Sequence, residues 1–216
     1  MKFISFYFII FVFIVGCNKG FDPSYSPEAL EQRAAVYDTL IKFQEFWHYL
    51  VINKDPTGKW TQFNYADSTW PEGRAQLGYG DSDEVTVVSR SYPISKNANM
   101  TTYFRKKIFL TAAQTTNVDL FEVFMHRDDG AVVYVNGTEK IRSNMPAGVI
   151  KYSTPALDTM EGQVGPRSEY AAYYPGIQAF GLKAGWNIIA VEVHQYSVKE
   201  KDMSFELTLF SRRSIN

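Results

Sequence analysis

The sequence has a single cysteine among 216 residues, which excludes a disulfide framework and zinc sites built from several cysteines. It also lacks an excess of charge, because 22 Lys and Arg residues stand against 23 Asp and Glu residues. The basic residues are scattered and form no stripe for a phosphate backbone, so nucleic acid is not an expected partner. Hydrophobic residues make up 45% of the chain and aromatic residues 16%. That is enough apolar surface to offset the entropy of ordering a folded domain.

Spacings typical of catalytic sites are also missing. The sequence has no GxSxG nucleophile elbow, HExxH zinc motif, P-loop or GxGxxG loop. Its three histidines, which lie far apart and in or beside apolar runs, are His48, His126 and His194. Such placement is typical of structural histidines, although folding can bring distant residues together. Paired carboxylates for glycoside hydrolysis can be nominated from Asp128, Asp129 and Glu192, but the sequence does not set their separation. We expect no catalytic activity, and an unrecognised hydrolase remains a third alternative.

The one long hydrophobic run lies at the N-terminus, where Met1 and Lys2 precede the apolar stretch Phe3–Val15. A permanent membrane helix needs about 20 residues, so this shorter run is typical of a secretory signal. The following IVGC, residues 14–17, resembles the bacterial lipobox. This resemblance implies that residues 1–16 are a lipoprotein signal peptide and that Cys17 is lipidated. An ordinary cleaved signal with an incidental cysteine is the alternative.

A lipidated Cys17 predicts a location in the bacterial cell envelope, in the outer membrane or on the cell surface. The lipid anchor would be the only contact with the membrane. The polar, Pro-containing segment that follows indicates a tether, and Ser26-Pro27 is a typical helix start for a short helix over 27–37. We therefore expect a tether or short helix over 17–38 and a β-sandwich domain over 39–212.

Beyond the tether the apolar residues recur with period two. In MSFELTLF (203–210), apolar side chains alternate with Ser204, Glu206 and Thr208, which predicts a strand with one buried and one wet face. Strands with a polar face are typical of antiparallel sheets, so the predicted fold class is all-β, a sandwich or jelly roll. The predicted strands are 39–43, 46–52, 76–79, 84–89, 102–111, 118–126, 131–135, 177–182, 187–195 and 203–211.

Turn residues support this fold. Asn136-Gly137 follows GAVVYV directly and suits a tight hairpin turn, because both central residues must adopt positive φ. Asp128-Asp129-Gly130 favours the preceding reversal for the same reason. The segment 118–142 is therefore expected to run strand, turn, strand, turn, short strand.

The order of several motifs resembles a galactose-binding-like jelly-roll module of secreted and surface bacterial proteins. Such modules are appended to hydrolases such as phosphoesterases, and the sugar-binding domain of β-galactosidase-type glycosidases is similar. The motifs are WHYL (47–50), Gly58 and Trp60, DSTW (67–70), LGYGD (77–81), TTYFRK (101–106), DDGAVVYVNG (128–137), RSNMP (142–146) and GWNIIAVEVHQ (185–195). The match extends over residues 40–209. A usual Ser-Ser-Asp stretch is here KEKD (199–202), which keeps only the aspartate.

This resemblance implies a non-catalytic module that binds carbohydrate. Sugars are held by an aromatic face together with a few side chains that hydrogen-bond the hydroxyls. The candidates on loops are Trp70, Tyr79, Asp128, Asp129, Arg142, Asn144 and His194. A structural role is the alternative for each: the aromatic residues can fill the core, the aspartates can form turns, and Arg142 can pair with a turn aspartate.

A second kind of candidate is the acidic segment DSDE, with Asp81, Asp83 and Glu84. Oxygen ligands of this type bind calcium, and related jelly rolls carry a structural calcium ion. The spacing is not that of an EF-hand, and a solvated acidic loop is the alternative. No other cofactor is expected.

The segment 150–176 has little strand pattern and is rich in Pro, Gly and Tyr. Long connections of this kind often carry function. Its tyrosines Tyr170, Tyr173 and Tyr174 could contact a glycan or a protein, or the segment could pack across a sheet edge. Two functions are therefore expected: carbohydrate binding and, as the alternative, a scaffolding module that docks an envelope protein through this segment.

Overall fold

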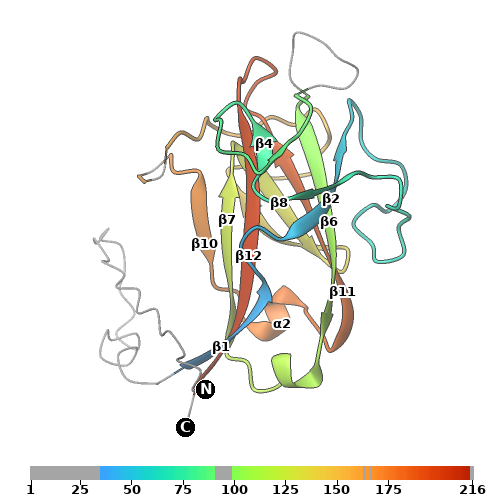
Figure 1. The fold of residues 1–216 in the computed structure, drawn as a ribbon, viewed down its shortest axis with the longest axis vertical. Helices are drawn as coiled ribbons and strands as arrows, with labels where there is room; N and C mark the ends of the chain where they lie inside the picture. The colour runs from blue at the N-terminus through green and yellow to red at the C-terminus, as the bar shows by residue number, and fades with distance from the viewer. Residues whose placement is uncertain (1–34, 91–98, 163, 166, 215–216) are drawn as a thin grey trace, which may run out of the picture. The chain divides into compact units, whose positions relative to one another are not determined.

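A computed structural model describes residues 35–90, 99–162, 164–165 and 167–214 as two facing β-sheets (Figure 1). The predicted signal peptide, Cys17 and the tether up to residue 34 lie outside the described residues. The first sheet has the order β10-β7-β12-β4-β5, and β1 also pairs with β12. Its strands are β1 (Ala35–Ile41), β4 (Leu77–Tyr79), β5 (Thr86–Val87), β7 (Leu120–Arg127), β10 (Tyr170–Tyr173) and β12 (Met203–Ser214).

The second sheet has the order β3-β2-β6-β11-β8-β9. Its strands are β2 (Phe46–Val51), β3 (Glu72–Arg74), β6 (Thr101–Leu110), β8 (Gly130–Val135), β9 (Thr138–Ser143) and β11 (Gly185–His194). Two short helical turns complete the described chain, η1 (Ala112–Gln114) and α2 (Ile177–Phe180). Apart from the parallel pair β4 and β5, the paired strands run antiparallel. The predicted all-β sandwich is confirmed.

The core lies between the sheets and is built by alternation. In β12 the apolar side chains at every second position, Met203 to Leu209, are buried, as the period-two pattern predicts. The expectation of a wet opposite face was wrong for Ser204 and Glu206, which are buried as well. Phe205 stacks on Phe104 of the second sheet, with ring centroids 4.1 Å apart, and meets the ring of Trp47 edge to face at 5.0 Å. These contacts join the two sheets, because aromatic side chains bury large areas and favour offset or edge-to-face packing.

The predicted Asn136-Gly137 turn joins β8 and β9. The expectation for Asp128-Asp129-Gly130 was wrong in its reason, because these residues have no positive φ and connect β7 of the first sheet to β8 of the second. Asn136 and Gly137 have φ angles of +52° and +86°, as a tight hairpin between β8 and β9 requires. The Asn136 side chain also donates to Asn187 Oδ1 at 2.9 Å and accepts from the Ile188 N–H at 3.1 Å, which ties the hairpin to β11.

Several element predictions were wrong. Residues 177–182 were expected as a strand, but Ile177–Phe180 form the helical turn α2, ended by Gly181 at φ +80°. Its apolar residues Ile177 and Phe180 stand three apart, so one helical turn points both toward the core. The expected helix over 27–37 is also wrong at its end, because β1 begins at Ala35 and pairs with β12. Strands β3 and β10 were missed because each is too short to show an alternating pattern.

The outer face of the second sheet is covered by segments 52–71 and 144–160. Arg105 on β6 is fully buried there: it donates to Asp67 Oδ2 at 2.8 Å and to the carbonyl oxygens of Trp60 and Gln62. The Trp60 ring packs edge to face on Tyr103. Further along this face, a small second cluster is formed by Val132, Met145 and Ala156.

Candidate functional site

The aromatic candidates from the sequence are inside the protein. Trp70 is buried and packs edge to face on Tyr65 at 5.7 Å, and Tyr79 belongs to the core between the sheets. Neither ring presents an open face to solvent. The structural alternative therefore describes both residues.

Asp128 and Asp129 lie together at one end of the sandwich. Asp129 accepts hydrogen bonds from two backbone N–H groups, those of Met160 and Tyr196, each at 2.7 Å. Asp128 is 5% exposed. Burial, followed by contact with the Asp129 carboxyl, raises the pKa of Asp128 to about 10. Asp129 thus holds two loops in place. Both aspartates also line a pocket of about 290 Å³, together with residues 159–161 and 199–202.

The polar candidates near this end are also engaged. Asn144 donates to the carbonyl oxygens of Asp129 at 3.2 Å and Asp158 at 2.7 Å. His194 is fully buried, and its Nδ1 lies 3.0 Å from Thr101 Oγ1 and 2.8 Å from the Thr154 carbonyl oxygen. Internal hydrogen bonds thus use the Asn144 amide and His194 Nδ1, whereas the buried Nε2 of His194 has no hydrogen-bond partner among the described residues.

Arg142 also forms an ion pair, but its partner differs from the one that was expected. It pairs with Glu139 through two bonds of 2.7 Å instead of pairing with a turn aspartate. It also donates to the carbonyl oxygens of Pro146 and Gly148. Its guanidinium thereby closes the loop after β9, which explains its presence without a ligand.

An open groove of about 420 Å³ lies instead on the outer face of the first sheet. It is lined by Phe43, Gln76, Asp83, Phe124, Met125, His126, Tyr170, Ala171, Ala172, Glu206 and Thr208. The strand register explains this set. His126 on β7 stands opposite Tyr170 on β10 and Glu206 on β12, so the three side chains form one row across the sheet. They alternate with core residues and therefore face outward.

One edge of β12 has a gap in its strand pairing next to the groove. One edge of this long strand pairs with β1 from Leu209 onward and with β4 from Met203 to Phe205, at opposite ends (Figure 1). Glu206 lies between the two paired stretches and accepts a hydrogen bond from the Gln44 N–H. Glu206 is 6% exposed, and burial raises its pKa, an effect that the Gln44 N–H partly offsets.

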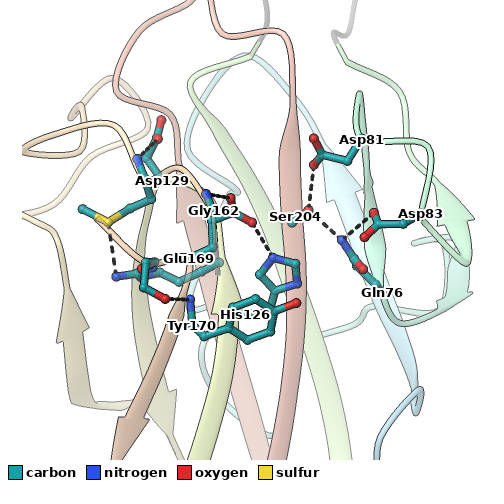
Figure 2. Close-up of polar contacts among 12 residues, drawn as sticks. Gln76, Asp81, Asp83, His126, Asp129, Gly162, Glu169, Tyr170 and Ser204 are labelled. Carbon is teal, nitrogen blue, oxygen red and sulfur yellow. Dashed lines mark hydrogen bonds and ion pairs between the residues drawn. The ribbon is translucent and has the colours of Figure 1, made fainter. Parts of the chain in front are cut away.

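One wall of the groove is a braced aromatic ring. Tyr170 is 50% exposed, and its ring stacks on the imidazole of His126, with centroids 4.2 Å apart and planes inclined by 10°. His126 Nε2 lies 2.7 Å from Glu169 Oε2, and the other Glu169 oxygen accepts from the Gly162 N–H at 2.7 Å (Figure 2). The tyrosine ring is therefore held in a fixed orientation.

The opposite wall is a hydrogen-bonded polar chain. Gln76 Nε2 donates to Ser204 Oγ at 2.7 Å and to Asp83 Oδ1 at 3.2 Å, and Ser204 Oγ donates to Asp81 Oδ2 at 3.3 Å (Figure 2). Burial, followed by repulsion from Asp202, raises the pKa of Asp81. These contacts orient amide and carboxylate groups at the groove without filling it.

The predicted acidic cluster is assembled at the same edge. Asp81, Asp83 and Glu84 each offer a carboxylate oxygen, and these oxygens lie within 4.8 Å of one another. Glu84 Oε1 accepts from the Asp81 N–H at 2.9 Å, which holds the loop in this shape. Such a group of oxygen ligands can hold a metal ion.

The segment 150–176 partly follows each of its two interpretations. Tyr170–Tyr173 form the edge strand β10 on β7, so this part packs at the sheet edge. Tyr173 packs against the core, whereas Tyr170 and Tyr174 remain exposed. The sequence did not single out Gln76, His126 or Glu206 for the groove. The available signal was the predicted wet face of residues 203–210, which contains Glu206.

Comparison with known proteins supports the fold. The structure resembles that of a glycosyl hydrolase family 2 member from Bacteroides cellulosilyticus with a TM-score of 0.51 and 15% sequence identity, over 84% of this chain and 20% of that one. The chain has the predicted jelly-roll fold. β-Glucuronidases from Bacteroides uniformis (TM-score 0.47, 13% identity) and Bifidobacterium dentium (0.47, 10%) are also similar. They match 82% and 76% of this chain, and 18% and 21% of their own.

The jelly roll thus spans about a fifth of the length of these enzymes. No protein-family model matches the sequence, and no curated protein matches it. Within the described residues, no helix is long and apolar enough to cross a membrane.

Proposed function

We propose that the protein is a non-catalytic carbohydrate-binding module and that the groove on the first sheet is its binding site. The observation that carries this proposal is the half-exposed Tyr170 ring, braced by His126 beside a set of fixed hydrogen-bonding groups. An aromatic face packs on the C–H side of a sugar ring, while amide and carboxylate groups bind its hydroxyls.

The size and lining of the groove support this use. Its volume of about 420 Å³ lies within the range of small-ligand pockets. Phe43 and Phe124 add exposed apolar surface, and the Asp83 carboxylate supplies an acceptor at the opposite wall. The fold also occurs in a glycosyl hydrolase, which places it beside carbohydrate chemistry in another protein.

Titration of neutral oligosaccharides into the purified domain tests the proposal. Tyr170→Ala should weaken binding by about tenfold, because it removes the stacking surface. Tyr196→Ala removes a similarly exposed tyrosine outside the groove lining and should leave affinity unchanged. Equal losses in both variants, or no binding by the wild type across a broad glycan panel, would refute the site.

Calcium at Asp81, Asp83 and Glu84 is a further part of the proposal. Their carboxylate oxygens suit a hard cation and would bind it directly, and the ion would stabilise the loop before β5. Added calcium should raise the melting temperature of the wild type but not that of Asp81→Asn/Asp83→Asn. An equal response in both proteins would contradict this assignment.

The cell-envelope location and lipid anchor also remain proposals, supported by the N-terminal apolar run and Cys17. Metabolic labelling with a palmitate analogue in a bacterial host should label the wild type and not Cys17→Ala. An unlabelled wild type that is still secreted would favour the ordinary cleaved signal.

A scaffolding function is the second candidate, because the exposed aromatic surface continues past the groove. Tyr174 packs on Phe124 edge to face at 6.3 Å, and it follows the edge strand β10. If the surface binds a protein, Tyr174→Ala should weaken that complex while glycans fail to bind. Glycan binding that survives in Tyr174→Ala and falls in Tyr170→Ala favours the first candidate.

A further inference from the structure

The lining of the groove has more acidic than basic side chains. Asp83 and Glu206 line it, and the lining residues include no lysine or arginine. The one basic side chain is His126, whose Nε2 is bound to Glu169. The nearby Arg74 is directed to Gln44, donating to its backbone carbonyl oxygen at 3.1 Å and to Oε1 at 3.0 Å.

Glu206 is the more constraining of the two carboxylates. It stands at the β12 end of the row, with His126 between it and Tyr170, so a sugar that extends from the tyrosine ring across His126 would meet it. The Gln44 N–H binds Oε1 only, and no hydrogen bond from a described residue reaches Oε2. Asp83 lies at the rim with one oxygen bound by Gln76. A ligand therefore meets hydrogen-bond acceptors first.

We propose, building on the carbohydrate-binding function, that the groove selects saccharides without a carboxylate and prefers those that carry an amine. A uronate would bring a third negative charge beside Asp83 and Glu206. An ammonium group would be attracted by the same carboxylates and would donate to their unoccupied oxygens. Neutral sugars fall between these extremes.

Matched sets of sugars provide the test. Neutral hexosides, the 2-amino-2-deoxy hexosides and the hexuronides are titrated in both gluco and galacto configurations at low salt. We expect uronides to bind about tenfold more weakly than neutral sugars, and amino sugars several-fold more tightly. Added salt should shrink both differences, because the groove is partly open to solvent.

The Glu206→Gln variant assigns the effect to a residue. The substitution keeps the side-chain shape and an oxygen that can accept from Gln44, so the fold is preserved. It should narrow the difference between uronide and amino sugar by about tenfold, and Asp83→Asn by less because Asp83 is more exposed. Glu72→Gln removes a charge from β3 in the other sheet and should leave the difference unchanged.

Repeating the titrations with chelator and with calcium distinguishes the effect of a bound metal ion from that of the Glu206 carboxylate. Calcium at the acidic cluster would cancel the contribution of Asp83, while that of Glu206 would persist. Uronides that bind as tightly as neutral sugars in chelator, or a preference that Glu206→Gln leaves intact, would overturn this inference and leave the binding function standing. If no sugar of any class binds, the proposed function itself fails.

Discussion

The outer faces of the two sheets differ in how far they are exposed to solvent. On the second sheet, long loops cover the face, and Arg105 donates hydrogen bonds to Asp67 and to two backbone carbonyl groups. On the first sheet, the face keeps Tyr170 at 50% and Phe124 at 40% exposure beside the groove. The difference shows that a charged residue can serve to hold a loop on the sheet. A strand residue without a recognisable motif can instead line a binding groove.

The same contrast applies to the end of the sandwich. Asp129, Asn144 and His194 look like a ligand site by residue type, but each bonds to the loops that fold over them. In the groove, by contrast, no hydrogen bond from a described residue reaches Oε2 of Glu206. Three substitutions test whether closed and open regions differ in this way.

The largest effect is expected for Arg105→Met on the closed face. It removes the closest charged partner of the buried Asp67 carboxylate and leaves only the longer contact of 3.9 Å with Lys107 Nζ. Urea denaturation should therefore show a loss of about 3–5 kcal/mol in unfolding free energy. Arg167→Met breaks the exposed pair with Asp158 and should cost less than about 1 kcal/mol. The double variant Arg105→Met/Asp67→Leu should recover much of the lost unfolding free energy, because no unpaired charge is then buried. Similar small losses in both single variants would show that burial of Arg105 matters little.

A smaller effect of opposite sign is expected at Asp128. Its pKa is about 10 in the folded protein against 3.8 for the ordinary carboxyl, so the folded state keeps a proton that the unfolded state releases. Stability should therefore be greatest below about pH 4 for this group and fall as pH rises toward 10. Asp128→Asn mimics the protonated form and should raise the melting temperature at pH 8 by about 5 °C. Thermal melts between pH 5 and 9 measure this.

In those melts the wild type should lose stability with rising pH more steeply than Asp128→Asn. Parallel pH profiles, or a variant less stable than the wild type at pH 8, would mean that Asp128 is ionised and stabilised by a partner in the folded protein.

The smallest stability effect is expected for Tyr170→Ala on the open face. Its ring contacts His126 but is half exposed, so the unfolding free energy should change by less than about 1 kcal/mol. Sugar affinity should nevertheless fall as described above. If Tyr170→Ala loses as much stability as Arg105→Met, Tyr170 is a structural residue. The two outer faces would then not differ in the role of their residues.

Features that depend on residues close together in the sequence could be predicted, whereas features that depend on contacts between distant segments could not. Alternation in residues 203–210 and the Asn136-Gly137 turn are local, and both were predicted correctly. The helical turn at Ile177 was misread because a segment of four residues is too short to distinguish the two periods. The acidic cluster at Asp81 was found because its members are neighbours in the chain.

The groove could not be found in this way. His126, Tyr170 and Glu206 come from three strands, and only the register of β7 with β10 and β12 places them in one row. Their residue types are unremarkable one at a time. Burial of Trp70 and Arg105 was equally hidden, because it depends on where segment 52–71 packs.

The amino-acid sequence by itself determined that this chain forms antiparallel sheets with one apolar face in the core, since period-two alternation and positive-φ turns act over a few residues. Tertiary structure decided which polar groups stay available. That choice depends on loop packing and on strand register between distant segments, and the free energy of each polar side chain is settled by whether a loop or a solvent-filled groove lies over it.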